Sequence, residues 1–132
     1  MLKKLFLLFF CFLPLFNFAE TPIKQGKATF YAHTFVGKKT TSGERYDPEA
    51  MTAAHATLPL HSYVQVRNLK NGKSVVVRIN DRMSRKSRFV IDLSKKAAYQ
   101  LGIVGAGMGN VKISRIDKET ALALQKKANE DV

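Results

Sequence analysis

Alternating apolar and polar positions recur in short runs along the chain, and they predict a protein built mainly of β-strands. Within residues 74–80, Val75, Val77 and Ile79 share one phase, whereas Arg78 falls in the opposite phase. Successive side chains of a strand point to opposite faces, so the apolar phase marks the face that packs in a core. Comparable runs predict further strands at residues 27–31, 51–55, 63–68, 89–93 and 111–116.

Turn residues separate these predicted strands. Asn71-Gly72 lies between residues 63–68 and 74–80 and is a strong hairpin signal. Residues 36–48 form a loop rich in Gly, Lys, Thr and Asp, whose length is typical of a functional loop. Residues 21–25 are predicted to be a short linker.

Two helices are also predicted. Ser94 can cap a helix over residues 95–101, and Gly102 can end it. Asp117 can cap a second helix over residues 118–128, whose weak apolar face lets it either fray or pack on the rest. Several short strands with one or two helices predict a small, closed β-barrel.

The N-terminal segment has the pattern of a secretory signal peptide. Two lysines, at positions 3 and 4, precede an apolar stretch, residues 5–16, that is too short to cross a bilayer comfortably. Ala19 suits the last position before a cleavage site. We therefore expect residues 1–19 to be removed on export to the periplasm or cell envelope, leaving no membrane span.

The single cysteine of the chain, Cys11, falls within this segment, so the mature chain would form no disulfide. A lipid-modified Cys11 is the alternative, but Phe10 stands where a small residue is needed. Removal of 19 of the 132 residues would leave 113, enough for one domain with a modest core. We assign that domain to residues 26–116 and a helical tail to residues 117–132, and we expect a monomer.

The net positive charge of the chain favours anionic binding partners. The net charge of +12 would fall to about +10 once the two N-terminal lysines are removed. Inside a cell such a charge indicates nucleic acid. For an exported protein, anionic envelope polymers or membrane surfaces are favoured, and a basic surface without a specific partner remains the alternative.

Four polar residues stand where an apolar strand pattern ends or a turn begins, namely Glu44, Asp47, His55 and Asp81. If the fold gathers them, carboxyl groups and an imidazole would face one cleft, a set that suits acid/base chemistry on a glycosidic bond. The three histidines of the expected mature chain lack the paired spacing of a zinc site. We expect no metal and no other cofactor.

Asp81 continues the phase of the apolar strand that precedes it, which would place it at the barrel rim, partly desolvated. Desolvation favours the neutral acid that a proton donor needs, whereas a nearby arginine would oppose it. Each of these residues also has a structural reading. Asp81 can cap a turn, Glu44 can be an exposed loop carboxylate, Asp47 can start the turn before Pro48, and His55 can be a buried structural histidine.

Four segments occur in an order that resembles the rare lipoprotein A (RlpA) family of bacterial lytic transglycosylase-like proteins. They are ATFYA (residues 28–32), GKKTTSGERYDPEAMTAAHATLPLHSYVQVRNLKNGKSVVVRIND (37–81), VIDLSKKAAYQLG (90–102) and VKISRI (111–116). The resemblance implies a six-stranded double-psi β-barrel that binds peptidoglycan glycan strands. Well-studied members cleave strands stripped of their stem peptides.

Carried over by position, the resemblance places the family's functional carboxylates on Glu44 and Asp81 and its histidine on His55. Asp47 matches a further acidic position. Asp92 matches the aspartate of the IDLS segment, which we interpret mainly as structural, bracing the turn before the next helix.

The chain departs from the family pattern in places that matter. Met83-Ser84 replaces the usual Gly-Pro after the NDR motif, and a basic run follows. Phe30 stands where the first motif usually has tryptophan. We expect no C-terminal peptidoglycan-binding repeat domain.

The predicted signal peptide, the candidate residues and the family resemblance together predict an exported lytic transglycosylase. Asp81 would protonate the oxygen between N-acetylmuramic acid and N-acetylglucosamine, and the sugar's own 6-hydroxyl would then close a 1,6-anhydro ring. The resulting Asp81 carboxylate or Glu44 would accept the hydroxyl proton, and His55 would orient a carboxylate or hold the sugar. The predicted substrate-binding residues are Asp47 and Arg82, with Tyr31, Tyr46 and Phe35 as sugar platforms.

Two other functions stay open. A non-catalytic module that binds peptidoglycan or another polysaccharide would use the same groove without cutting. A binder of nucleic acid or another polyanion would use the basic surface, but the predicted export and the carboxylates count against it.

Overall fold

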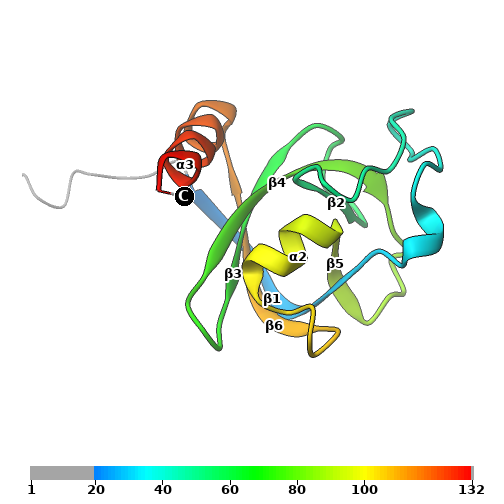
Figure 1. Cartoon of the computed structure of the whole chain (residues 1–132), viewed down its shortest axis with the longest axis horizontal. Coiled ribbons are helices and arrows are strands. Elements are labelled where there is room, and N and C mark those ends of the chain that lie inside the picture. The colour runs from blue at the N-terminus through cyan, green and yellow to red at the C-terminus, as the bar shows by residue number, and fades with distance from the viewer. Residues whose placement is uncertain (1–19, 132) are drawn as a thin grey trace, which may run out of the picture.

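The computed structural model describes residues 20–131, so the predicted signal peptide and Cys11 lie outside the described residues. Figure 1 shows strands curving around a common centre, with one helix across them and another at the side. The elements are β1 (Glu20–Phe30), a 3-10 helix η2 (His33–Phe35), β2 (Thr52–His55), β3 (Tyr63–Asn68), β4 (Ser74–Arg82), β5 (Phe89–Leu93), α2 (Lys95–Leu101), β6 (Gly109–Ile116) and α3 (Lys118–Glu130).

The six strands close into a barrel in the order β1-β5-β2-β4-β3-β6. Two neighbouring pairs, β1 with β5 and β2 with β4, run parallel, and the remaining pairs are antiparallel. Parallel neighbours need long crossover connections, which here carry the loops that build the site. The predicted closed six-stranded double-psi barrel is confirmed.

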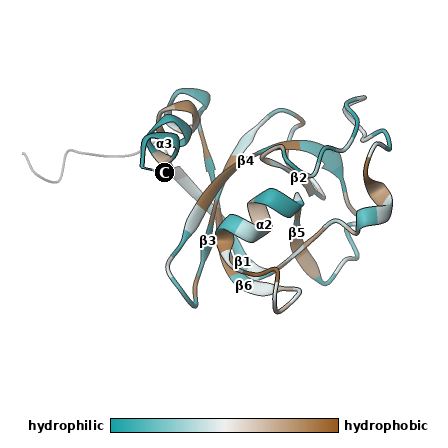
Figure 2. Cartoon of the chain, viewed as in Figure 1, coloured by the Kyte–Doolittle hydropathy of each residue, from teal (hydrophilic) through white to brown (hydrophobic). Residues whose placement is uncertain are grey.

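Inward-facing aliphatic side chains fill the barrel. Figure 2 shows hydrophobic and hydrophilic residues interspersed along the strands, and the side chains on the inner face of each strand pack in the core. Helix α2 begins as predicted, because the Ser94 hydroxyl accepts a hydrogen bond from the Ala97 amide, and it ends at Gly102, whose φ is 83°. Its buried face joins one cluster with the strands, whose members include Val64, Val66, Val77, Ile79, Ile91, Leu93, Ala97, Ala98, Leu101, Val111 and Ile113.

The β3–β4 hairpin forms at Asn71-Gly72, as predicted, and it also secures the end of α2. The side-chain amides of Asn68 and Asn71 both donate to the Leu101 carbonyl, at 2.9 and 3.2 Å. The Asn68 amide oxygen accepts from the Lys70 N–H at 2.9 Å, so its buried side chain is bonded at both polar atoms. A helix carbonyl that would otherwise be orphaned thereby gains two donors.

Helix α3 packs against the outside of the barrel, which decides between the two predicted states of this segment. Ala121 is buried in a cluster with Val76 and Ile116, and the Gln125 side chain donates to the Val76 carbonyl at 3.4 Å. Neither helix within residues 20–131 has the length and hydrophobicity to cross a membrane.

The prediction that residues 21–25 are a linker is wrong. They form the first half of β1 and pair with β6, where Thr21 lies opposite Arg115 and Gln25 opposite Lys112. The segment is polar because its side chains are exposed, so it lacks the apolar pattern of the other strands. Its backbone is fixed by a partner strand about ninety residues later, which no local pattern shows.

Candidate functional site

Two carboxyl groups flank Ala54 at the end of β2. In the parallel pair Ala54 lies opposite Asp81 of β4, and in the antiparallel pair it lies opposite Asp92 of β5. The register with β4 skips Asn80, since Ala53 pairs with Ile79 and the next residue with Asp81. This one-residue bulge turns the end of β4 toward the neighbouring loops, as bulges beside functional sites often do.

Asp81 is held as a carboxylate by four donors. The Tyr31 hydroxyl donates to Oδ2 at 2.6 Å, while the Thr41 amide, the Thr41 hydroxyl and the Arg82 amide each donate to Oδ1 at 2.9 Å. Burial is the largest single influence on its pKa and raises it, but these hydrogen bonds together outweigh burial and hold the pKa below its usual value. The sequence left open whether desolvation or an opposing group would dominate at Asp81, and in the structure the hydrogen bonds dominate.

Asp92 is the opposite case. It is half-buried, and its Oδ1 is a buried atom without a hydrogen-bond partner among the described residues. Burial and the negative charge of Asp81 raise its pKa from the usual value of 3.8 to about 6. Sequence reasoning assigned Asp92 a bracing role. The available signal was a carboxylate inside an apolar strand, FVIDL. The charge that acts on Asp92 comes from Asp81 in another strand, which the local pattern does not show.

The three candidate aromatic residues form one cluster beside these carboxyls. The rings of Tyr31 and Tyr46 lie parallel, 4.3 Å apart and tilted by 10°, and Phe35 meets Tyr31 edge-on at 5.8 Å. Only 8% of Tyr31 and 4% of Tyr46 are exposed, against 47% of Phe35. Burial and the nearby Asp81 carboxylate strongly raise the pKa of Tyr31, which stays a neutral hydrogen-bond donor. Phe35 is thus the one open ring of the three, and the two tyrosines brace the site rather than serve as open platforms.

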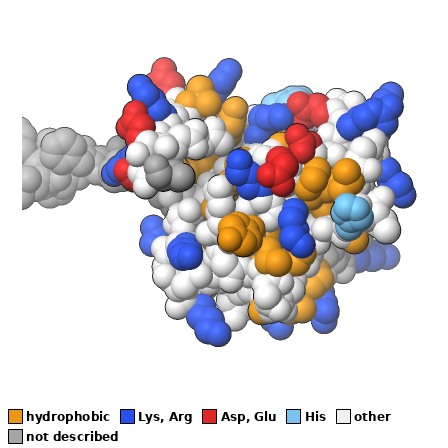
Figure 3. Space-filling model, in the orientation of Figure 1, with side chains coloured by type: hydrophobic (Ala, Val, Ile, Leu, Met, Phe, Trp, Pro, Cys, Tyr) orange, Lys and Arg blue, Asp and Glu red, His pale blue; other side chains and the backbone are white. Residues whose placement is uncertain are grey.

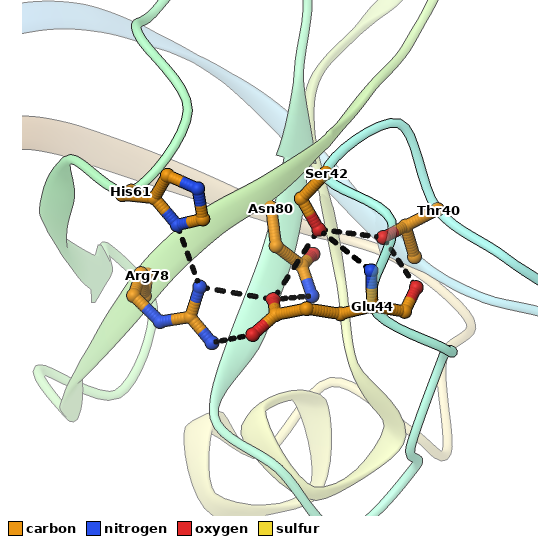
Figure 4. Close-up of polar contacts among 6 residues, drawn as sticks. All are labelled: Thr40, Ser42, Glu44, His61, Arg78 and Asn80. Atoms are coloured by element: carbon orange, nitrogen blue, oxygen red, sulfur yellow. Dashed lines mark hydrogen bonds and ion pairs between the residues drawn. The ribbon is translucent and has the colours of Figure 1, made fainter.

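Glu44 is occupied by a different set of partners, drawn in Figure 4. Its carboxylate receives both terminal nitrogens of Arg78 at 3.0 Å, the Asn80 amide at 3.2 Å and the Ser42 hydroxyl at 3.3 Å. The Arg78 guanidinium, followed by the other donors, holds the pKa of Glu44 below its usual value. Arg78 also lies 3.1 Å from Nδ1 of His61.

One turn, residues 40–44, connects these two carboxylates. The turn is closed by the Thr40 amide and hydroxyl, which donate to the Glu44 carbonyl at 2.8 and 2.7 Å. On one flank the side chain of Glu44 faces Arg78, and on the other Thr41 grips Asp81. Glu44 and Asp81 are therefore brought to the same end of the barrel.

His55 lies in β2 next to Ala54 and is buried. Its Nδ1 accepts hydrogen bonds from the amides of Thr57 and Leu58 at 3.1 and 3.0 Å, which leaves Nε2 as the protonated nitrogen of a neutral ring. Burial, then the charges of Arg82 and Lys24, lower its pKa. His55 is thus a neutral group whose orientation the backbone fixes.

The remaining candidates have local roles. The Asp47 carboxylate accepts a hydrogen bond from the Glu49 amide at 2.9 Å, which matches the structural reading of Asp47 as a turn residue. The Arg82 guanidinium donates to the His55 carbonyl at 3.1 Å and is thereby held beside the site. Within residues 20–131, no group of three or more His, Cys, Asp or Glu side chains is arranged to hold a metal ion.

Sequence comparisons agree on one kind of relative. The sequence profile of the family described as lytic transglycolase matches residues 23–113. A Neisseria meningitidis protein named endolytic peptidoglycan transglycosylase RlpA is 55% identical over 93 residues, which are 70% of this chain and 39% of that protein. The Vibrio cholerae protein of the same name is 52% identical over 99 residues, 74% of this chain and 38% of that protein. The chain thus spans about two fifths of the length of these relatives.

Solved structures share the fold at low identity. A Streptomyces papain inhibitor superposes with a TM-score of 0.56 and 22% identity, over 70% of this chain and 94% of the inhibitor. The Clavibacter michiganensis expansin superposes with a TM-score of 0.56 and 20% identity, over 75% of this chain and 51% of the expansin. These likenesses concern the barrel alone.

Proposed function

The chain belongs to the RlpA family of lytic transglycosylases, and on this premise we propose that it is an endolytic peptidoglycan transglycosylase of the cell envelope. Its substrate is the bond between N-acetylmuramic acid and the following N-acetylglucosamine. Its product is a strand ending in 1,6-anhydro-N-acetylmuramic acid. The relatives' names supply the reaction class, and the carboxyl pair beside Ala54 supplies the chemistry.

The observation that carries the proposal is a contrast between two neighbouring carboxyls: four protein groups donate to Asp81, whereas the buried Oδ1 of Asp92 has no partner among the described residues. Asp92, whose pKa is about 6, holds a proton at mildly acidic pH, while the hydrogen bonds around Asp81 keep it ionised. Groups whose environments push their pKa values apart are the usual sign of an acid and a base in one site. We therefore assign proton donation to Asp92, which replaces the earlier assignment of that role to Asp81.

The reaction proceeds without water. The Asp92 carboxyl gives its proton to the glycosidic oxygen, the bond from C1 of the muramic acid to that oxygen breaks, and N-acetylglucosamine leaves as an alcohol. The positive charge that develops on the muramic acid is stabilised by the Asp81 carboxylate. The sugar's 6-hydroxyl then bonds to C1, and its proton passes to the Asp92 carboxylate, which restores the starting state.

Other side chains position the sugar and the two carboxyls. Phe35 offers an exposed ring for the apolar face of a sugar. His55 presents Nε2–H as a fixed donor, and Arg82 stands beside it. Glu44 acts at a distance, because it anchors the turn whose Thr41 holds Asp81.

Mass spectrometry of purified glycan strands tests this proposal. After incubation with the protein, we expect products 18 or so mass units lighter at the muramic acid end than hydrolysis would give, as loss of water in ring closure requires. The Asp81→Asn variant should form product at least about 10²-fold more slowly, with its melting temperature nearly kept. Unchanged strands, or hydrolytic ends, would contradict the proposal.

A second function, a non-catalytic peptidoglycan-binding module, is favoured by one observation. Four protein groups already donate to Asp81, an arrangement that a purely structural carboxylate also shows. This alternative predicts that strands bind and stay uncut, and that Asp81→Asn lowers the melting temperature without any change in product.

A further inference from the structure

The segment that joins β4 to β5 carries positive charge only. Its sequence from position 82 to 88 is RMSRKSR, in which four of seven residues are Lys or Arg and none is acidic. Arg85, Lys86 and Arg88 are exposed, and Arg82 is half-buried. The segment, called here the basic loop, lies at the lower right of Figure 1, after the end of β4.

The basic loop has a defined shape. The Ser87 amide donates to the Ser84 carbonyl and the Lys86 amide to the Ser84 hydroxyl, both at 3.1 Å. The Phe89 amide donates to the Ser87 hydroxyl at 3.1 Å, and the Arg88 guanidinium lies 4.9 Å from the centre of the Phe89 ring. Its cations are therefore carried by an ordered turn, which lowers the entropic cost of binding an anion.

The root of the basic loop is part of the candidate site. Met83 packs against the cluster of Tyr31, Tyr46 and Ala54. Arg82 follows Asp81 directly and donates to the His55 carbonyl at 3.1 Å. A glycan strand bound across the carboxyls of Asp81 and Asp92 would therefore continue onto the basic loop.

In the part of the chain that the structure describes, these cations have no acidic partner. Among residues 20–131, the one ion pair joins Arg78 to Glu44, on the other flank of the site. Lys24 of β1 adds a further charge on this side, since it lies three residues before Lys27, which pairs with Phe89 at the end of the basic loop. Figure 3 shows Lys and Arg side chains around the lower and right-hand rim, whereas the acidic side chains gather in the upper half of that face.

We propose that the basic loop, with Lys24 beside it, is a subsite that binds carboxylates carried by the glycan strand next to the bond that is cut. This inference rests on the proposed function, which places a muramic acid polymer in the site. Carboxylates on that polymer have two sources, the lactyl group of muramic acid where no peptide is attached and the stem peptide where one is. Guanidinium groups pair with carboxylates through two parallel hydrogen bonds, which suits Arg85 and Arg88 to this role.

Binding of defined strands to matched variants tests the inference. The loop variant is Arg85→Gln/Lys86→Gln/Arg88→Gln. The control is Lys70→Gln/Lys73→Gln/Lys126→Gln, which removes three exposed charges elsewhere, two of them in the hairpin roughly 25 Å along β4 from Arg82. A charge-preserving variant, Arg85→Lys/Arg88→Lys, keeps the cations without the forked geometry. Melting temperatures establish that each variant is folded.

Three substrates distinguish the two possible sources of the recognised carboxylate. They are strands stripped of peptide, the same strands with their lactyl carboxylates converted to methylamides, and strands that keep their peptides. We expect the loop variant to bind at least one anionic strand about tenfold more weakly than the wild type, with the difference shrinking to about twofold or less on the methylamide. Loss on stripped strands assigns the lactyl carboxylate, and loss on peptide-bearing strands assigns the stem peptide. The charge-preserving variant should lose less than the loop variant.

Three results would overturn the inference, two with glycan strands and one with lipid vesicles. One is an equal loss for the loop variant and the control, which would mean attraction by overall charge. The other is an equal loss on the methylamide strands, which would mean that carboxylates are not recognised. Anionic lipid vesicles that bind the loop-dependent surface while no strand does would also overturn it.

Its failure is separable from failure of the proposed function. Loop-dependent binding of anionic strands that stay uncut supports the subsite and contradicts the transglycosylase activity. Anhydro products formed with no loop dependence contradict the subsite and support the activity.

Discussion

The two ends of β4 hold buried polar side chains in opposite ways. At the hairpin end, Asn68 has both side-chain polar atoms bonded, to Leu101 and Lys70. At the other end, beside Asp81, Asp92 leaves one buried carboxyl oxygen without a partner in the described chain. A fully bonded buried amide stabilises a fold, whereas a buried carboxyl oxygen without a partner costs stability and favours the protonated acid. The contrast supports the proposal that the Asp81 end of the barrel carries the active site.

The sharpest test of this contrast is Asp92→Asn. The amide cannot donate a carboxylic proton, so we expect product formation to fall by at least about 10²-fold. Stability at pH 7 should rise, because the wild-type protein must either ionise Asp92 unfavourably or retain its proton. The shift from 3.8 to about 6 corresponds to about 3 kcal/mol before solvent screening, and we expect about 1–2 kcal/mol.

Rate and unfolding free energy measured on the same preparation decide the outcome. The sign of the stability change follows from linkage. A raised pKa means that the folded state binds the proton more tightly, so the contribution of Asp92 to stability is full below pH 3.8 and is lost as pH rises toward about 6. Asp92→Asn should therefore gain on the wild type above pH 6 and not below pH 3.8. Full activity in this variant would remove Asp92 from the mechanism.

Asn68→Ala should show the reverse pattern. Loss of its amide leaves the Leu101 carbonyl with one donor and the Lys70 amide with none, so we expect about 1–3 kcal/mol of lost stability. Product formation per folded molecule should stay within about twofold of the wild type. Chemical denaturation and an activity assay check this, and a large loss of turnover at unchanged stability would erase the difference between the two ends.

Glu44→Gln probes the turn that connects Glu44 to Asp81. The side chain keeps its shape but loses the charge that pairs with Arg78, so the turn over residues 40–44 should hold Asp81 less firmly. We expect a rate loss of about three- to tenfold, smaller than that of Asp92→Asn, mostly in kcat. The ion pair is exposed, so stability should change by about 1 kcal/mol or less. A loss as large as that of Asp92→Asn would make Glu44 a reacting group.

The smallest effect is a shift in one titration. The Asp81 charge is the second cause of the raised Asp92 pKa, after burial. In Asp81→Asn the pKa of Asp92 should therefore move from about 6 toward 3.8 without reaching it, because burial persists. The side-chain carboxyl carbon chemical shift of Asp92, followed by NMR against pH, reports this directly. An unchanged titration would show that the two carboxyls are not coupled.

The sequence was sufficient wherever a short segment determines its own structure. The helix over residues 95–101, with Ser94 and Gly102 at its ends, matches α2, and the hairpin at Asn71-Gly72 forms. These features depend on neighbours within a few positions along the chain. Residues 21–25 were misassigned because their strand is set by β6, whose residues lie far away in the sequence.

The candidate site shows the same difference between features set by local sequence and features set by distant residues. The candidates Glu44 and Asp81 were found because turn and strand patterns end at them. Their partners, Arg78 and Tyr31, come from other elements, 34 and 50 residues away. The protonation of Asp92 depends on burial and on a charge in the next but one strand, neither of which is visible in the local pattern. The contacts of these side chains therefore became visible only once the barrel placed the groups together.

The order of strands has a consequence for how the molecule comes into being. β6 is the last strand made, yet it lies between β1 and β3, and β1 has no other neighbour than β5 and β6. A nascent chain therefore carries β1 with both edges unpaired until residue 89 has emerged, and the ring cannot close before residue 116. Such non-local pairing predicts slow folding after synthesis is complete, with the open edges of β1 exposed to chaperones or to aggregation in the interval.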